Sequence, residues 1–189
     1  IIVQRVFSGQ VTKIETGEVV GKIGNGLLLY FGINEHDKES DIDAAVNKVL
    51  KLKLWDSEDG TKRWARNVKD MGYEILVVSQ FTLYAVINGT KPDFHKSMRA
   101  DSSKPFFEKV VQRFRDLYAP DKIQTGAFGN YMKVDSFGDG PCNILLDYPK
   151  EEADHPEPTK ATAKTGKQKS KVSGCARSEE RRVGKECRS

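Results

Sequence analysis

The chain has 189 residues and a formal net charge of +4, which suits one domain with an appendage and excludes a large multidomain assembly. No apolar run approaches the roughly 18 residues of a membrane span and no secretory leader is visible, so we expect a cytoplasmic protein without a membrane partner. Three cysteines are too few for a disulfide framework or a structural zinc site. Because the chain does not begin with Met, we expect one or two residues to precede Ile1.

The net charge comes entirely from the C-terminal end. Residues 1–149 hold 20 basic and 20 acidic side chains, whereas residues 150–189 hold 11 basic and 7 acidic ones and no Leu, Ile, Phe, Tyr or Trp. Such a segment cannot bury enough apolar surface to offset its ordering entropy, which predicts a domain over 1–149 and a disordered basic tail over 150–189. Residues 177–189 resemble the translation of a sequencing-adapter oligonucleotide, so we expect an artefact there. The Lys-rich stretch 160–171 is either a solvating tail or an RNA-attracting one.

The N-terminal half is predicted to be rich in strands. Short β-rich runs at 1–7, 10–14 and 18–23 are separated by Ser8-Gly9 and by Thr16-Gly17, which favours an antiparallel meander. A continuous apolar run at 27–33 predicts a strand buried on both faces. The spacing of apolar residues in 37–51 predicts a helix, and 52–55 can form a further strand.

The C-terminal half is predicted to add strands and one more helix. An apolar strand at 74–78 continues through 84, and a helical apolar stripe covers 103–118. Two last strands are expected at 131–136 and 142–147, hinged at 138–141. The fold class predicted is mixed α/β, α+β-like, with antiparallel and mixed sheets in a barrel-like sandwich and two to three outer helices.

The usual catalytic signatures are absent. There is no phosphate-binding Gly-rich loop, no nucleophile elbow and no paired-histidine metal motif. Of the three histidines, only His95 could assist a Ser or Thr nucleophile, and as a metal ligand it has no obvious partner.

Two short polar segments are the candidates for chemistry. Ser79, Gln80 and Thr82 follow an apolar strand that Phe81 and Leu83 continue. Side chains alternate along it, so we expect Ser79, Phe81 and Leu83 on one face and Gln80, Thr82 and Tyr84 on the other. A strand end with satisfied hydroxyls is the plain alternative. Gly140-Pro141 can hold a cis bond at a cost of about 0.5–1 kcal/mol and aim two carbonyls in one direction, although an ordinary turn would also fit.

Together these segments resemble the D-aminoacyl-tRNA deacylases. Residues 79–83 match the family's Ser-Gln-Phe-Thr-Leu motif and Gly140-Pro141 resembles its Gly-cisPro motif, with supporting matches at 3–6, 91–94 and 126–132. The family's usual Asn and Thr around the Gly-Pro pair are replaced by Gly138 and Asn143. A sister family carries Pro-Gln-Ala-Thr instead, so Ser79 and Phe81 indicate the D-specific branch.

The resemblance implies a cytosolic homodimer that hydrolyses the ester joining a D-amino acid, or glycine, to the terminal adenosine of tRNA, without a metal or organic cofactor. It implies that the 2′-hydroxyl of that adenosine assists the attack in place of a side-chain nucleophile. Gly140-Pro141 is expected to enter the partner subunit's pocket and exclude L side chains, and Arg5 to hold this turn by donating to two carbonyls. The residues implied to contact the adenosine and ester are Ser79, Gln80, Phe81 and Thr82, and those implied to line the pocket are Phe94, Phe128, Gly129, Asn130, Tyr131 and Met132.

Contact with tRNA phosphates calls for a local basic patch, because residues 1–149 have no net charge. The candidates are Lys62, Arg63 and Arg66 beside Trp64, and Lys91 and Lys96 near the first motif, with a solvated loop as the alternative. Two other functions remain open: a module that binds aminoacyl-tRNA without hydrolysis, and an ester hydrolase that uses Thr82 as its nucleophile.

Overall fold

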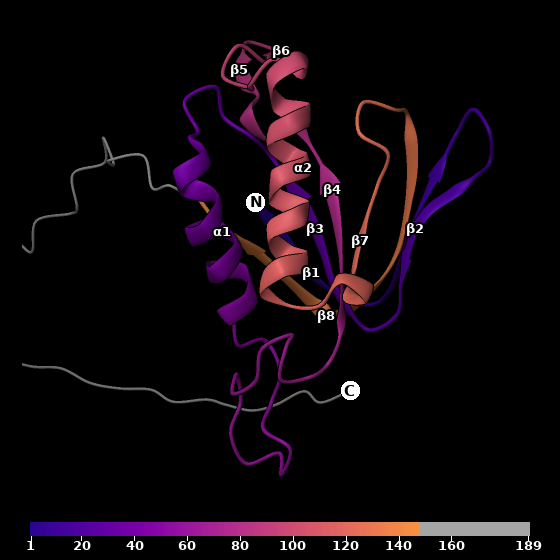
Figure 1. The fold of residues 1–189 in the computed structure, drawn as a ribbon, viewed down its shortest axis with the longest axis vertical. Coiled ribbons are helices and arrows are strands. Elements are labelled where there is room, and N and C mark those ends of the chain that lie inside the picture. The colour runs from indigo at the N-terminus through magenta and orange to yellow at the C-terminus, as the bar shows by residue number, and fades with distance from the viewer. Residues whose placement is uncertain (148–189) are drawn as a thin grey trace, which may run out of the picture. The chain divides into compact units, whose positions relative to one another are not determined.

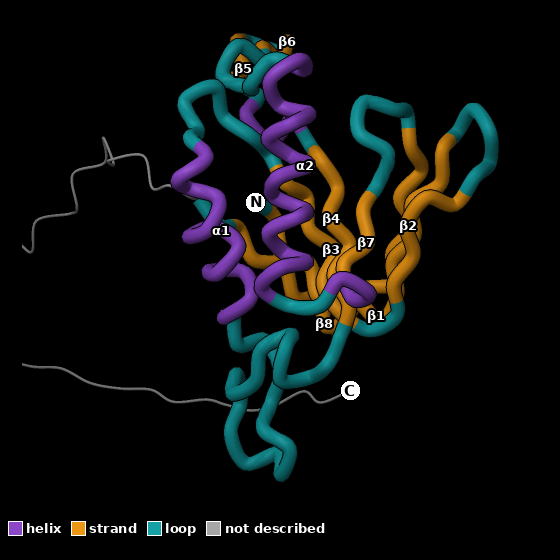
Figure 2. Tube along the Cα trace, viewed as in Figure 1, coloured by secondary structure: helices purple, strands orange, loops and turns teal. Residues whose placement is uncertain are grey.

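One long strand, β1 (Ile2–Lys13), organises the sheet. Along one edge it pairs antiparallel with β3 (Gly26–Phe31) and then with β2 (Val19–Ile23), and along the other with β8 (Met132–Leu145). The strands β4 (Glu74–Ser79) and β7 (Ile123–Thr125) extend the sheet beyond β3 in parallel, giving the order β2-β1-β3-β4-β7. Figure 2 shows these strands curling around one another. This computed structural model describes residues 1–147, which lie in one compact unit.

Three predictions about local structure are wrong. The runs 1–7 and 10–14 form a single strand without a turn at Ser8-Gly9, because Ser8 and Gly9 pair with β8 on one edge and Gly9 with Ile23 of β2 on the other. The two last strands also form one strand, with residues 138–141 in its interior rather than at a hinge. Residues 52–55 form no strand; an isolated bridge joins Trp55 to Arg66.

The sheet buries both of its faces. Side chains of one face meet inside the curled sheet: Val6, Val11, Ile23, Leu28, Leu76 and Val78. The alternate residues of β3 and β4, including Leu27 and Ile75, pack against the helices. The two ends of the strand order, β2 and β7, approach each other closely, since a Cβ at Gly21 of β2 would lie only 2.5 Å from the Thr125 backbone oxygen of β7. The result is the nearly closed, barrel-like mixed sheet expected for this chain.

Two helices cover the other face (Figure 1). They are α1 (Glu39–Lys51) and α2 (Ala100–Leu117), close to the predicted ranges 37–51 and 103–118. Each turns a stripe of apolar side chains toward the sheet, and Arg113 joins them through an ion pair to Asp43 at 2.6 Å. The mixed α/β class with two outer helices is therefore confirmed.

The remaining elements gather at the two ends of the sheet. At the upper end in Figure 1 lie β5 (Val86–Asn88), β6 (Lys91–Asp93), the 3-10 helix η1 (Phe81–Tyr84) and the start of α2. At the lower end lie the long connection 52–73 and the 3-10 helix η2 (Pro120–Lys122). The carboxyl ends of the parallel strands β3 and β4 point to the upper end, where Phe31 pairs with Ser79.

Expectations for the tail lie outside the described residues. These are the disordered basic segment 150–189, the Lys-rich stretch 160–171 and the adapter-like end 177–189. Within residues 1–147, no helix is long and apolar enough to cross a membrane.

Candidate active site

The first motif does not continue as a strand. β4 ends at Ser79, and Gln80 leads in an extended conformation into η1, whose four residues include Phe81 and Thr82. The alternation of faces expected for this segment is therefore wrong. The chain folds closely over the end of β3, where a Cβ on Gly32 would lie 3.0 Å from Leu83 Cβ.

A cavity of about 930 Å³ opens beside this turn. It brings together segments that are about 100 residues apart in the sequence, from Phe31 to Val134, and Phe81 and Phe94 meet there edge to face with ring centroids 5.0 Å apart. The residues expected at the site that line this cavity are Ser79, Gln80, Phe81, Phe94, Phe128, Gly129, Asn130, Tyr131 and Met132.

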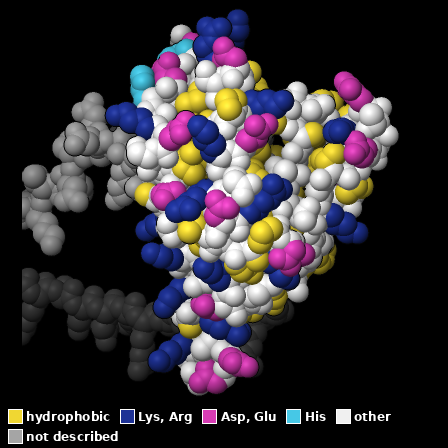
Figure 3. Space-filling model, in the orientation of Figure 1, with side chains coloured by type: hydrophobic (Ala, Val, Ile, Leu, Met, Phe, Trp, Pro, Cys, Tyr) yellow, Lys and Arg dark blue, Asp and Glu magenta, His cyan; other side chains and the backbone are white. Residues whose placement is uncertain are grey.

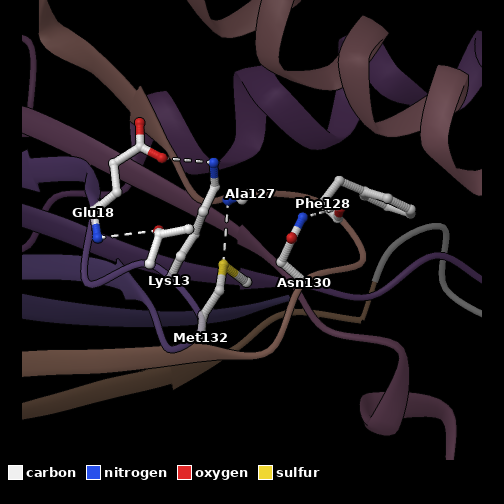
Figure 4. Close-up of polar contacts among 7 residues, drawn as sticks. Lys13, Glu18, Ala127, Phe128, Asn130 and Met132 are labelled. Carbon is white, nitrogen blue, oxygen red and sulfur yellow. Dashed lines mark hydrogen bonds and ion pairs between the residues drawn. The ribbon is translucent and has the colours of Figure 1, made fainter.

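The loop 126–131 is held in shape by its own polar contacts (Figure 4). The Ala127 amide donates to Met132 Sδ at 3.2 Å, and Asn130 Nδ2 donates to the Phe128 carbonyl at 3.1 Å. Gly129 has a φ of +75°, a left-handed conformation that glycine adopts readily. In the same view, Lys13 and Glu18 form an ion pair at 2.8 Å across the neighbouring β1–β2 turn. The loop is thus a preformed wall of the cavity.

Sequence reasoning missed the wall formed by the approach to α2. His95, Ser97, Arg99 and Ser103 also line the cavity, and the Ser97 hydroxyl donates to the Phe81 carbonyl at 2.7 Å. That hydrogen bond fixes the approach to α2 against η1. Their place in the sequence was the signal that could have found them, because these residues directly follow the supporting motif 91–94. They were missed in part because the predicted helix began at 103, whereas α2 begins at Ala100.

Thr82 lies at the edge of this arrangement. It is exposed, does not line the cavity, and its hydroxyl accepts a hydrogen bond from Gln80 Nε2. His95 Nδ1 lies 3.0 Å from Asp93 Oδ1. Hydrogen bonds from the backbone amide and then the imidazole of His95 hold the pKa of Asp93 below its usual value. The imidazole is therefore engaged with a carboxylate rather than with the Thr82 hydroxyl.

The second motif lies elsewhere on the chain. Gln4 pairs with Asn143 and Val6 with Gly138, so Arg5 alone faces a bulge of four residues, 139–142. The Gly140–Pro141 peptide bond in this bulge is cis, and neither residue lines the cavity of the same chain.

Arg5 does contact the bulge, but not as expected. Its Nε and Nη2 lie 2.9 and 3.1 Å from the carboxylate oxygens of Asp139, and its Nη1 donates to the Leu54 carbonyl. The expected pair of turn carbonyls is thus replaced by one carboxylate and the backbone of the 52–73 connection. Arg5 joins two segments that are far apart in the sequence.

The basic candidates divide between the two ends of the sheet. Lys91 and Lys96 flank Phe94 at the cavity end. Lys62, Arg63 and Arg66 lie in the 52–73 connection at the opposite end, with Trp64 53% exposed beside them. Over residues 1–147 no three His, Cys, Asp or Glu side chains are grouped so as to hold a metal ion.

Comparisons with known proteins agree on one family. The family model described as D-Tyr-tRNA(Tyr) deacylase matches residues 2–147. The chain is 43% identical over 146 residues to a D-aminoacyl-tRNA deacylase 1 of Leishmania major, covering 77% of this chain and 95% of that protein. It is 44% identical to a D-aminoacyl-tRNA deacylase of Dictyostelium discoideum, with the same coverage.

Two solved structures share the fold of this chain. A protein titled c-Myc DNA Unwinding Element Binding Protein is 40% identical, with a TM-score of 0.74 over 78% of this chain and 97% of that one. A probable eukaryotic D-amino acid tRNA deacylase, 16% identical, has the same fold at a TM-score of 0.66 over 77% of this chain and 96% of that one. The chain belongs to the D-Tyr-tRNA(Tyr) deacylase family.

Proposed function

We propose that this chain hydrolyses the ester that joins a D-amino acid, or glycine, to the terminal adenosine of tRNA. The observation that carries the proposal is the cavity in which residues 79–81 meet Phe94 and the loop 126–131, in a chain of this family. A cavity of about 930 Å³ is large enough for an aminoacylated nucleoside, since ligand pockets commonly measure about 300–1,000 Å³.

Backbone groups of η1 are suited to polarise the ester carbonyl. Because a 3-10 helix bonds each amide to the carbonyl three residues earlier, the amide of Phe81, which lines the cavity, has no partner within η1. Such fixed donors stabilise the oxyanion that develops when water attacks an ester. The 2′-hydroxyl of the adenosine, beside the ester, assists that attack, so the reaction depends on positioning rather than on a protein nucleophile.

A second copy of the chain completes the site in this proposal. β8 pairs only with β1 among the described strands, which leaves the other edge of a 14-residue strand open. Phe137 is 68% exposed on this strand and contacts Phe7 of β1, with ring centroids 5.9 Å apart. An open edge with exposed aromatic side chains favours association of two copies. The bulge with Gly140 and Pro141 lies on the same strand.

Chirality is then selected by exclusion. Gly140 and Pro141 of one subunit enter the cavity of the other and occupy the space that an L side chain would need. Exclusion by backbone is a stronger filter than attraction, because binding discriminates apolar groups by only about 1–3 kcal/mol. Glycine, without a side chain, passes this filter together with D-amino acids.

The test is a deacylation assay on the full chain with D-tyrosyl-, L-tyrosyl- and glycyl-tRNA. We expect release of D-tyrosine and glycine and essentially no release of L-tyrosine. Similar rates for the two tyrosyl enantiomers would contradict the exclusion mechanism. Saturable binding of D-tyrosyl-tRNA without any released amino acid would instead support the binding module, and a covalent adduct on Thr82 would support the threonine hydrolase.

A further inference from the structure

A second, smaller cavity lies directly beside the first. It measures about 400 Å³ and runs along α2, between that helix and residues 125–128. We call it the α2 groove. Its lining residues are Lys104, Phe107, Glu108, Val111, Gln112, Arg115, Thr125, Gly126 and Phe128.

The α2 groove continues the larger cavity. Phe128 lines both, so one aromatic ring forms the wall between them, and it packs against Phe107 with ring centroids 5.7 Å apart. Ser103 lines the larger cavity and the next residue, Lys104, lines the groove. A chain-like ligand that leaves the larger cavity past this wall therefore enters the α2 groove.

The cations of the groove are not engaged within the chain. Neither Lys104 nor Arg115 forms a hydrogen bond or ion pair with any other described residue, although Arg115 is half-buried. On the opposite side of the same helix, by contrast, Lys109 and Arg113 pair with Glu39 and Asp43 of α1. Figure 3 views the molecule from the side covered by α1 and α2, and there Lys and Arg side chains are interspersed with acidic ones. The unpaired cations of α2 are thus the ones that face the groove.

Resting on the proposed function, we propose that the α2 groove binds the nucleotide preceding the terminal adenosine of tRNA. Lys104 contacts the phosphate that joins the two nucleotides, and the preceding base packs on Phe128, since aromatic stacking accepts any base. Glu108 accepts a hydrogen bond from the amino group of that base, which is cytosine in the CCA end of tRNA. Arg115, about 16 Å farther along the helix axis, contacts a more distant phosphate.

Two short probes isolate this site from the hydrolytic site. Adenosine fills the larger cavity alone, whereas the dinucleotide CpA also reaches the groove. We expect the wild-type protein to bind CpA more tightly than adenosine. Lys104→Ala should weaken CpA binding about threefold to tenfold and leave adenosine binding unchanged, because Lys104 contacts only the phosphate. Equal affinity of the wild-type protein for adenosine and CpA would overturn the proposal.

Kinetics with a matched control complete the test. Lys104→Ala and Arg115→Ala should lower kcat/KM for D-tyrosyl-tRNA but not for D-tyrosyl-adenosine, which has no phosphate. Lys48→Ala removes an equally exposed helical charge on α1 and should change neither value. Equal losses with both substrates, or a loss with Lys48→Ala as large as with Lys104→Ala, would overturn the groove proposal. Failure of the wild-type protein to cleave either substrate would overturn the hydrolytic function, while the CpA measurement still decides the groove.

Discussion

The two sequence motifs differ in where they lie in the fold of a single chain. Residues 79–81 line an open cavity whose walls all come from the same chain, whereas Gly140 and Pro141 lie in an edge strand and line no cavity of their own chain. The first motif is therefore placed by the core, through β4, and the second by a bulge opposite Arg5. In the proposed function, catalysis and chiral exclusion therefore have separate structural supports, which can be perturbed one at a time.

The largest effect is expected from separating two copies of the chain. Phe137→Lys places a charge on the exposed β8 face, and aromatic residues at the centre of interfaces commonly contribute 2 kcal/mol or more, so dimerisation should weaken by at least about 30-fold. Deacylation of D-tyrosyl-tRNA should fall with it. Sedimentation velocity and the deacylation rate, measured at the same protein concentrations, check this result.

The matched control is Val19→Lys, on an exposed β2 residue away from β8. It should leave both the sedimentation coefficient and the rate unchanged. A fully active Phe137→Lys monomer would show that one chain suffices for hydrolysis.

The next effect comes from loosening the bulge. Arg5→Ala removes the contacts to Asp139 and Leu54, whereas Arg5→Lys keeps the charge but loses the forked geometry. The ratio of D- to L-tyrosyl-tRNA cleavage should fall by about tenfold or more in the alanine variant, because a mobile turn no longer excludes an L side chain. The lysine variant should be intermediate. An unchanged ratio together with reduced thermal stability would assign Arg5 a purely structural role.

A smaller effect is expected at Thr82. Its hydroxyl accepts from Gln80 Nε2 outside the cavity, so Thr82→Ala should lower kcat by less than about tenfold, whereas the loss of a nucleophile costs several orders of magnitude. Rapid quenching followed by mass spectrometry should detect no acyl group on the wild-type chain. A trapped adduct at Thr82 would reverse this assignment.

The smallest effect on activity is expected at the far end of the sheet. Hydrogen bonds from Ser57 and Thr61 lower the pKa of Asp59 to about 2, so this carboxylate stabilises its turn above its unfolded pKa of about 3.9 and loses that contribution as the pH falls toward 2. Asp59→Asn should speed amide exchange at Thr61 at pH 7 without changing kcat/KM. A changed kcat/KM would show that this connection takes part in the reaction.

Most of the fold could be predicted because it follows from periodicity. The apolar runs that became β3 and β4 and the helical stripes of α1 and α2 carry their own signal. The continuous β1 could not be predicted, because Gly9 reads as a turn residue yet lies inside a strand, paired with Ile23 of β2 and Ser136 of β8. Pattern alone cannot separate these two uses of glycine.

The site was predicted less evenly than the fold. The residues of the cavity came from motif resemblance, but η1 was missed because a 3-10 turn of four residues has no periodicity to detect. Ser97 was missed because its role is one hydrogen bond to the Phe81 carbonyl, a contact that depends on how the segments fold together. The Arg5–Asp139 pair is likewise a contact across 134 residues that no local pattern encodes.

The placement of the two tryptophans determines what intrinsic fluorescence reports for this protein. Trp55 is buried and Trp64 is 53% exposed, and both lie in the 52–73 connection, with none among the residues that line either cavity. A nucleoside that enters its own chain's cavity therefore leaves both emitters in an unchanged environment. Arg5 ties Leu54, the neighbour of Trp55, to the bulge that carries Gly140 and Pro141. In the proposed dimer, the emission of Trp55 is thus an optical reporter of that turn, and a shift on adding a nucleoside is the signal expected when the turn meets its occupant.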